Sequence, residues 1–488
     1  MSSGDNLASL TARELVALFR RRAASPVEAA REALSRIERW NGRYNAFCLV
    51  DGERALRDAG ASEARWLSGK PKSHIDGVPA TVKDLILTKD WPTLRGSRTI
   101  DPSQDWSEDA PAVTRMREAG AVLLGKTTTP EFGWKAVCDS PLTGITRNPW
   151  DDRMTSGGSS GGAAVAAALR MGWLHLGTDG GGSIRIPAGF TGVFGIKPTF
   201  GLVPAYPLSP FGTIAHLGPI TATVEDAARM LTIIAGPDDR DWYSLPYRPC
   251  DFTIGLAQGV RGLRMALCTR FDNATVDPQV SALVEAAAAL LAEAGANIEP
   301  RDPPFPDPAD MFAAHWYTGA AQLRSSIPRE RWSLLDPGFN RIAVAGEMIA
   351  HMEYARRLSE RADLGLRMAR FHRDFDVLLT PTLPLTAFAA GHVAPPGADQ
   401  TDWAHWTPFS FPFNLTQQPA ASIPCGFTTA GLPVGLQIVA AKYREGLVLR
   451  VARAFEELCP IKLPVPAMLE AAGKDGGGGA ERHVRPAS

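Results

Sequence analysis

The sequence has few cysteines, and they follow no recognisable pattern. The six lie far apart, with neither a Cys-x-x-Cys pair nor a histidine cluster beside them: Cys48, Cys138, Cys250, Cys268, Cys425 and Cys459. This spacing excludes the usual zinc-binding and disulfide-framework arrangements. We therefore expect reduced thiols, no metal and no cofactor.

The sequence also lacks an excess of charge of one sign and lacks long hydrophobic runs. It has 51 basic and 52 acidic residues among 488, a formal net charge of −1, which disfavours nucleic acid or an anionic membrane as a partner. No apolar run approaches the roughly 18 residues of a spanning helix, and residues 1–6 do not resemble a secretory signal. We expect a soluble, cytoplasmic protein that acts on a small molecule. A homodimer is one oligomeric state that the sequence leaves open.

Short apolar runs alternate with glycine-rich turns and helical stretches between about residues 77 and 236. This alternation is typical of an α/β layered core. Further apolar runs, each resembling a buried strand, return at 376–382, 420–427 and 432–439. Because the core pattern resumes after a mainly helical stretch, one discontinuous domain is favoured over two in series.

The predicted domain organisation has three parts. Residues 1–65 form an N-terminal helical segment packed on the core, in which Thr11 caps one helix and Ser25 precedes the next. Residues 66–470 form the main domain, with a helical stretch at about 245–375 that covers one side. Residues 471–488 include a run of glycines and are expected to be disordered.

One glycine motif formally matches a phosphate-binding loop. It runs from Gly120 to Thr127 as Gly-Ala-Val-Leu-Leu-Gly-Lys-Thr. Such a loop lies between a strand and a helix, whereas here the apolar interior is itself the strand, and Thr129-Pro130 follows where the helix would begin. Nucleotide binding at this segment is therefore disfavoured.

A second motif, Gly157 to Gly161, matches the Gly-x-Ser-x-Gly elbow of α/β hydrolases. The elbow requires a hydrophobic strand before the serine, but residues 149–156 are polar. An esterase with a Ser-His-Asp triad is a weak alternative, and no sequence context singles out its histidine among His216, His351, His372, His392 and His405.

Two serines framed by glycines, Ser159 and Ser183, carry the densest chemical signal. Glycine allows backbone N–H groups to approach a ligand closely, so Gly180, Gly181, Gly182 and Ser183 can direct several amides at one oxygen. Such an arrangement is typical of an oxyanion hole, where each donor contributes about 2.7–4 kcal/mol.

A serine nucleophile needs a base, and no histidine lies inside either serine motif. Lys83 follows the apolar run Val78 to Val82, which would bury its ammonium group. Burial disfavours the charged form, and a neutral amine can act as a base. A solvated salt bridge with the neighbouring Asp84 is the alternative interpretation of this lysine.

These motifs together resemble the amidase signature family. The resemblance rests on the block from Gly157 to Pro187 and on Gly77-Val-Pro-Ala-Thr-Val-Lys-Asp84, and further similar segments extend it over roughly residues 10 to 465. It implies a single α/β/α sandwich with a central twisted mixed sheet. It also implies an amide hydrolase with a Ser–cis-Ser–Lys triad.

By resemblance, Ser183 is the nucleophile, Ser159 relays the proton and Lys83 is the final base. The resemblance also implies a cis peptide before Ser159. It assigns a supporting network to Ser160, Asp179 and Arg185.

Three positions in this block depart from the family pattern. His175 and Ala167 stand where a small residue and a larger aliphatic one, respectively, are usual. We expect His175 to be a hydrogen-bonded core residue, because Trp173 and Leu176 lie beside it on an apparent strand. Gly180 replaces a larger residue and predicts a more flexible or more open nucleophile loop.

The substrate pocket is predicted from aromatic clusters. Phe132, Trp134, Cys138, Trp406 and Phe409 are the candidate lining residues, with ordinary core packing as the alternative. An apolar pocket with few polar groups suits a hydrophobic or aromatic amide, including an aryl amide, a carbamate or a cyclic oligoamide.

Two further functions remain as alternatives to a freestanding amidase. One is the glutaminase-type subunit of a glutamine-dependent amidotransferase, which passes ammonia to a partner. Such subunits usually have Ser-Leu-Asp-Gln where this chain has Thr213-Ile-Ala-His216, which lowers that option. The other is a scaffold with a dead site, which the intact serines and lysine disfavour.

Overall fold

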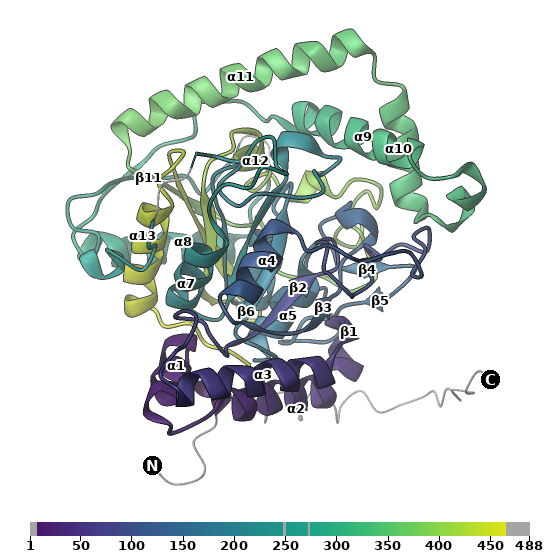
Figure 1. The fold of residues 1–488 in the computed structure, drawn as a ribbon. Coiled ribbons are helices and arrows are strands. Elements are labelled where there is room, and N and C mark those ends of the chain that lie inside the picture. The colour runs from purple at the N-terminus through teal and green to yellow at the C-terminus, as the bar shows by residue number, and fades with distance from the viewer. Residues whose placement is uncertain (1–6, 247–249, 272–273, 465–488) are drawn as a thin grey trace.

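The computed structural model describes residues 7–246, 250–271 and 274–464. Its centre is a mixed sheet of eleven strands in the order β1-β3-β2-β6-β8-β7-β12-β13-β11-β9-β10. Neighbouring strands run parallel at β2–β3, β2–β6, β9–β10 and β9–β11 and antiparallel elsewhere. This sheet, flanked by helices, confirms the predicted α/β class (Figure 1).

The strands of the main sheet are short and mostly buried. They are β1 (Phe47–Val50), β2 (Pro79–Lys83), β3 (Val122–Thr127), β6 (Leu174–Asp179), β7 (Phe194–Lys197), β8 (His216–Thr221), β9 (Arg264–Leu267), β10 (Asn297–Pro300), β11 (Val377–Pro381), β12 (Ala420–Phe427) and β13 (Pro433–Ala440). A separate hairpin pairs β4 (Asp139–Ser140) with β5 (Gly144–Ile145).

The α-helices of the described residues pack on the sheet or over its ends. They are α1 (Ala12–Arg21), α2 (Pro26–Tyr44), α3 (Gly52–Leu67), α4 (Pro111–Glu118), α5 (Gly161–Ala168), α6 (Arg185–Thr191), α7 (Val224–Ile234), α8 (Pro278–Glu293), α9 (Ala309–Ser325), α10 (Pro337–Glu347), α11 (His351–Asp374), α12 (Pro412–Leu415) and α13 (Glu445–Leu458). No described helix combines the length and the apolar character needed to cross a membrane.

The N-terminal helices begin where the sequence predicts. Thr11 and Ser25 each accept a hydrogen bond from the N–H of a glutamate three residues later, and that glutamate's carboxylate accepts one from the cap N–H. These capping boxes are encoded locally, which explains why they are predictable. The segment is not purely helical, however, because β1 leaves it and pairs with β3 as an edge strand.

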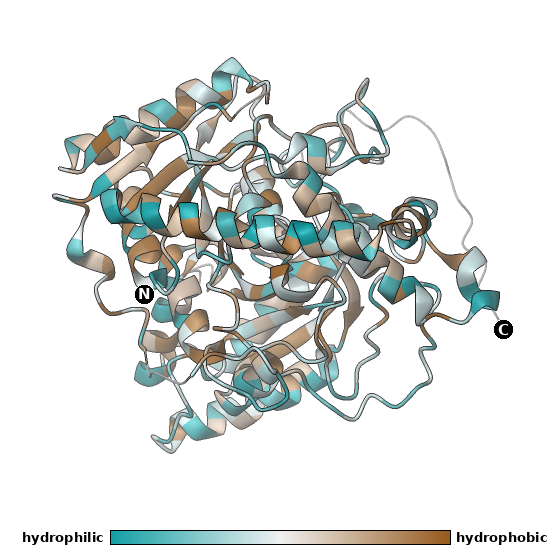
Figure 2. Cartoon of the chain, turned by 90° about the horizontal axis from the view of Figure 1, so that it is seen from above, coloured by the Kyte–Doolittle hydropathy of each residue, from teal (hydrophilic) through white to brown (hydrophobic). Residues whose placement is uncertain are grey.

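The stretch at 245–375 also contains more than helices. Its strands β9 and β10 extend the main sheet beyond β11. The long amphipathic stretch around residues 342–372 is divided into α10 and α11, with a break at 348–350. Figure 2 shows α11 from above as a largely hydrophilic helix lying over the molecule, with hydrophobic strands beneath it. The predicted tail at 471–488 lies outside the described residues.

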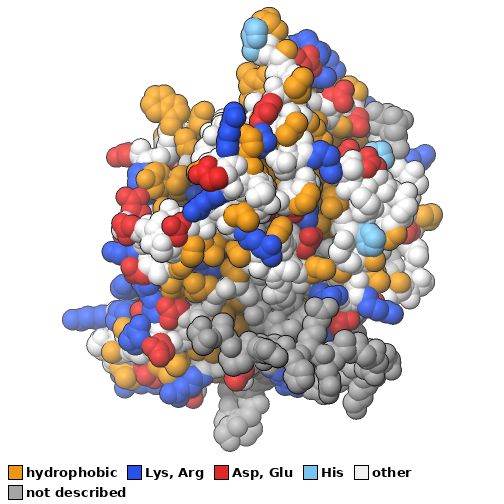
Figure 3. Space-filling view, turned by 90° about the vertical axis from the view of Figure 1, so that its right-hand side faces the viewer, with side chains coloured by type: hydrophobic (Ala, Val, Ile, Leu, Met, Phe, Trp, Pro, Cys, Tyr) orange, Lys and Arg blue, Asp and Glu red, His pale blue; other side chains and the backbone are white. Residues whose placement is uncertain are grey.

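Most of the aromatic side chains pack on the side of the sheet covered by α9 to α12. Trp316, Phe312, Trp403 and Phe411 form one interlocking group, with ring centroids 4.8–5.6 Å apart. On the face shown in Figure 3, acidic and basic side chains are interspersed. This agrees with the balanced composition and gives that face no extended patch of one sign.

Candidate active site

The carboxyl ends of two parallel neighbours, β2 and β6, carry the polar groups at the centre of the site. Lys83 is the last residue of β2, and Thr178 and Asp179 end β6. Because parallel strands end at the same edge of a sheet, these side chains lie close together. Ser159 and Ser160 lie directly before α5, which begins at Gly161.

The Lys83 ammonium nitrogen is fully buried among hydroxyl groups. Its Nζ lies 2.6 Å from Ser159 Oγ, 2.9 Å from Ser160 Oγ and 2.9 Å from Thr178 Oγ1. Among the described residues, no carboxylate lies within ion-pair distance of it, so the salt-bridge alternative for Lys83 is wrong. Burial lowers the pKa of Lys83 from 10.5 to about 7. A neutral amine is therefore accessible near neutral pH.

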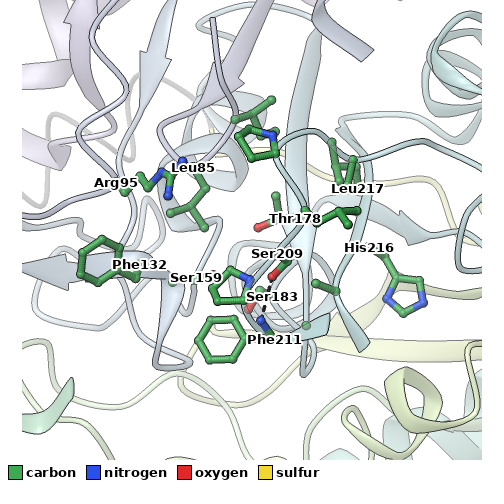
Figure 4. Close-up of a pocket in the computed structure, with 18 of the residues that line it drawn as sticks. Leu85, Arg95, Phe132, Ser159, Thr178, Ser183, Ser209, Phe211, His216 and Leu217 are labelled. Atoms are coloured by element: carbon green, nitrogen blue, oxygen red, sulfur yellow. Dashed lines mark hydrogen bonds between the residues drawn. The ribbon is translucent and has the colours of Figure 1, made fainter. Parts of the chain in front are cut away.

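The two serine segments are joined through their backbones. The N–H of Ser160 donates to the carbonyl of Ser183 at 3.0 Å, and the peptide bond between Gly158 and Ser159 is cis. Ser159, Thr178 and Ser183 line the same pocket, where Figure 4 shows them between Phe132 and Leu217. The structure thus brings together the lysine and the two serines that the sequence singles out.

The loop between β6 and α6 is held by a fully buried ion pair. Arg185 donates to both carboxylate oxygens of Asp179, at 2.9 and 3.0 Å, and also to the side chains of Asn414 and Gln437. Burial alone would raise the pKa of Asp179, but Arg185 overcomes this and holds it well below the ordinary value. Asp179 and Arg185 therefore remain charged and fix the loop.

The same carboxylate engages one of the four predicted oxyanion donors. The N–H of Gly182 donates to Asp179 Oδ1 at 2.7 Å, so the prediction that it faces the substrate is wrong. Gly182 has φ +126°, and a Cβ there would lie 2.5 Å from Ser410 Oγ, so only glycine fits. Among the described residues, the N–H groups of Gly180, Gly181 and Ser183 have no protein acceptor.

Comparisons with known proteins agree with this geometry. The amidase family model matches residues 28–449, which is most of the chain. The chain belongs to the amidase family. It is similar to an acylamidase of Rhodococcus erythropolis, with 36% identity over 473 residues, covering 93% of this chain and 96% of that one.

Other relatives of this amidase differ in what they are named for. One is the glutaminase-type subunit of a glutamyl-tRNA(Gln) amidotransferase of Myxococcus xanthus, 36% identical over 485 residues and covering 92% of this chain and 97% of that one. The crystal structure of a bacterial aryl acylamidase of the amidase signature family superposes with a TM-score of 0.85 at 29% identity, covering 95% and 98%. Fold and family are therefore shared by enzymes with different names and substrates.

The pocket of the amidase is mainly apolar and differs from the predicted one. Of the five candidate lining residues only Phe132 lines it, together with Leu85, Phe211, Leu217 and Trp316. The helical cover reaches the site through Trp316 of α9. A Cβ at Gly180 would lie 2.9 Å from the Trp316 ring, so the space freed by this glycine is filled and the loop is not more open.

The other four candidates are core residues, and their assignment to the pocket is wrong. Trp406 stacks on Phe190 with ring centroids 5.8 Å apart, and Phe409 contacts Phe271. Trp134 packs where Gly338 has no side chain. The Sγ of Cys138 lies 3.5 Å from Thr146 Oγ1. Aromatic clustering does not distinguish a packed core from a pocket wall, so the sequence could not separate them.

Neither histidine near the site bonds to a serine. His175, buried on β6, shares a hydrogen bond with Thr81 at 2.8 Å, and burial lowers its pKa to about 3, as expected of a core residue. His216 lines the pocket, but its Nδ1 lies 2.8 Å from the carbonyl of Ile214. Burial lowers the pKa of His216 well below its ordinary value. The esterase alternative therefore finds no Ser-His pair among the described residues.

The sequence missed two polar residues of the site. Thr178 is one of the three hydroxyl groups around Lys83, and its position just before Asp179 at the end of an apolar run was the only signal for it. Arg95 lines the pocket from a loop about 60 residues before Ser159 in the sequence, and no motif marks it.

Proposed function

We propose that this amidase hydrolyses the C–N bond of a carboxylic amide through an acyl-enzyme on Ser183. Ser183 Oγ attacks the carbonyl carbon while its proton passes through Ser159 to the Lys83 amine. The contact of 2.6 Å between Lys83 Nζ and Ser159 Oγ is the observation that supports this relay most strongly.

The negative oxygen that forms in this step is stabilised by backbone donors. The N–H groups of Gly180, Gly181 and Ser183 are the donors available for it. Collapse of the intermediate breaks the C–N bond, and the proton held by Lys83 returns through Ser159 to the leaving amine. Water then repeats the attack on the ester, releasing the acid and free Ser183. This chemistry needs neither a metal nor a cofactor.

The substrate is a small hydrophobic or aromatic amide. The rings of Phe132, Phe211 and Trp316 line the pocket and support this class, because aromatic walls bury apolar groups favourably. The enzyme works in the cytoplasm without nucleic acid or membrane. Light scattering of the purified protein decides between a monomer and a homodimer.

The experiment is a panel of aliphatic, aryl and cyclic amides assayed with wild type, Ser183→Ala and Lys83→Ala. We expect hydrolysis of at least one aryl or aliphatic amide, and a loss of about ten-thousandfold in kcat/KM in both variants while their melting temperatures show folded protein. Equal activity of Ser183→Ala would mean that another residue is the nucleophile.

The alternative is the glutaminase-type subunit of an amidotransferase, represented among the relatives. Ala215 and His216, the departures from its usual pattern, both line the pocket, where they contact whatever substrate is bound. Glutamine included in the same panel tests this alternative. Glutamine hydrolysis that appears only when companion subunits are added would favour it over a freestanding amidase.

A further inference from the structure

Arg95 places a cation on the wall of the active-site pocket without a partner of its own. Its side chain is half-buried and lines the same pocket as Ser159 and Ser183. Figure 4 shows it beside Leu85, with its guanidinium group directed toward the pocket interior. Among the residues that the structure describes, no carboxylate lies within ion-pair distance of this guanidinium and no acceptor hydrogen-bonds to it.

The backbone of Arg95 is fixed on both sides. Its carbonyl accepts the N–H of Phe132 at 2.8 Å, and the N–H of Gly96 donates to Asp84 Oδ2 at 3.2 Å. Arg95 has φ +54°, an uncommon state for a residue with a side chain, and Gly96 has φ +63°. A Cβ at Gly96 would lie 2.7 Å from the carbonyl of Thr129, so the loop is packed too tightly to turn Arg95 away.

The nearest carboxylate is already engaged elsewhere. Asp84 lies 3.4 Å from the fully buried Lys126 Nζ in addition to accepting the N–H of Gly96. No aspartate or glutamate lines the described pocket. The fully buried Arg185, by contrast, is paired with Asp179. The charge of Arg95 is therefore left without an ion-pair partner in a largely apolar pocket.

We propose that Arg95 binds a carboxylate carried by the substrate, so that the enzyme prefers amides bearing a negative group to neutral amides of the same size. The inference rests on the proposed amide hydrolysis and names its substrate class. A guanidinium presents two parallel N–H donors that match the two oxygens of a carboxylate, and such charge-assisted bonds are the strongest in an apolar setting. The aromatic wall binds the rest of the molecule.

The test compares p-nitroanilides whose acyl chain ends in a carboxylate, from succinic to adipic acid, with analogues that end in the isosteric isopropyl group. A second series places the carboxylate on the amine side, as acylated 4-aminobenzoate against acylated 4-isopropylaniline. We expect wild type to prefer the carboxylate in one series by about tenfold to a hundredfold in kcat/KM. The series in which the preference occurs identifies the side of the amide that Arg95 contacts.

Two variants and one control separate recognition from damage. Arg95→Gln should lose the preference while hydrolysing the isopropyl analogue within about threefold of wild type, and Arg95→Lys should retain part of it. Arg98→Gln removes an equal charge from an exposed position on the same loop, outside the pocket, and should keep the full preference. Glutarate should inhibit wild type more strongly than Arg95→Gln, which measures the same contact without turnover.

A carboxylate preference that survives in Arg95→Gln, or none in either wild-type series, would overturn the inference. In both cases continued hydrolysis of the neutral analogues would leave the proposed function standing. Failure of wild type to hydrolyse any amide would overturn both.

Discussion

At the scale of single residues, the chemistry depends on an amine kept from its usual charge. Lys83 is fully buried, and its three neighbours are neutral hydroxyl groups. A hydroxyl group solvates an ammonium less well than water and does not neutralise it. The pKa near 7 follows from this setting, and it makes the lysine a base at the pH of the cell.

The pH dependence of catalysis should report this amine. Because the base must be neutral, kcat/KM for an uncharged anilide should rise with pH and level off above an apparent pKa of about 7. Stopped or continuous assays from about pH 5.5 to 9 measure it. Lys83→Arg is the control, since a guanidinium stays charged throughout and should be inactive at every pH. A wild-type rate that falls across this range would contradict the assignment of Lys83 as base.

At the scale of elements, the loop from β6 to α6 positions the donors. Asp179 accepts the N–H groups of Gly182 and Ile184 in addition to the Arg185 guanidinium. Because one carboxylate fixes both the ion pair and the backbone of the loop, its loss should affect stability and catalysis together.

We therefore expect Asp179→Ala to lower the free energy of unfolding by about 3–5 kcal/mol, because it leaves the Arg185 charge buried and unpaired. The kcat of the remaining folded enzyme should fall about a hundredfold or more as the glycine loop relaxes. Urea unfolding and steady-state kinetics measure the two effects. Asp151→Ala is a matched control: Asp151 pairs with Arg153, whose side chain is 81% exposed, so the loss should stay below about 1 kcal/mol. Equal effects of the two variants would refute the role given to Asp179.

The elements that the sequence predicts well are those encoded by local patterns. Residues 420–427 and the strands near 377 and 433 are apolar runs between turn residues, and the caps at Thr11 and Ser25 need only a glutamate three residues later. The short strands β1, β9 and β10 lack such a pattern, because their place at or near a sheet edge depends on distant partners.

The same distinction applies to the site. The two serines and the lysine lie in recognisable local motifs, whereas Arg95 and Thr178 join them only through the tertiary fold. The sequence predicts Trp406 in the pocket, but it packs in the core, because an aromatic cluster satisfies either setting.

At the scale of the whole molecule, one sheet connects distant parts of the chain. The edge strand β1 comes from the first 50 residues and pairs with β3 next to the catalytic strand β2. The N-terminal segment is also tied to the core by polar contacts: the N–H of Ala12 donates to Asp226 Oδ1, and Trp173 Nε1 donates to the carbonyl of Leu10. The segment is therefore part of the folded unit.

A chain that begins at Trp66 should fail to fold. Removing residues 1–65 exposes the edge of β3 and the buried faces that α2 and α3 cover, which costs far more than the few kcal/mol by which a domain is stable. Soluble yield and thermal melting, with the full-length chain expressed in parallel, measure this. A soluble and active truncated protein would show that the first 65 residues are an accessory segment.

The most direct measurement is the site of the acyl group. A hydrophobic p-nitroanilide is mixed with the enzyme, the reaction is quenched in acid within the first turnover, and tryptic peptides are weighed. Arg170 lies between the two serines, so trypsin separates Ser159 from Ser183. The acyl mass is predicted on the peptide with Ser183 and absent in Ser183→Ala. An acyl group on the peptide with Ser159 in wild type would contradict the account.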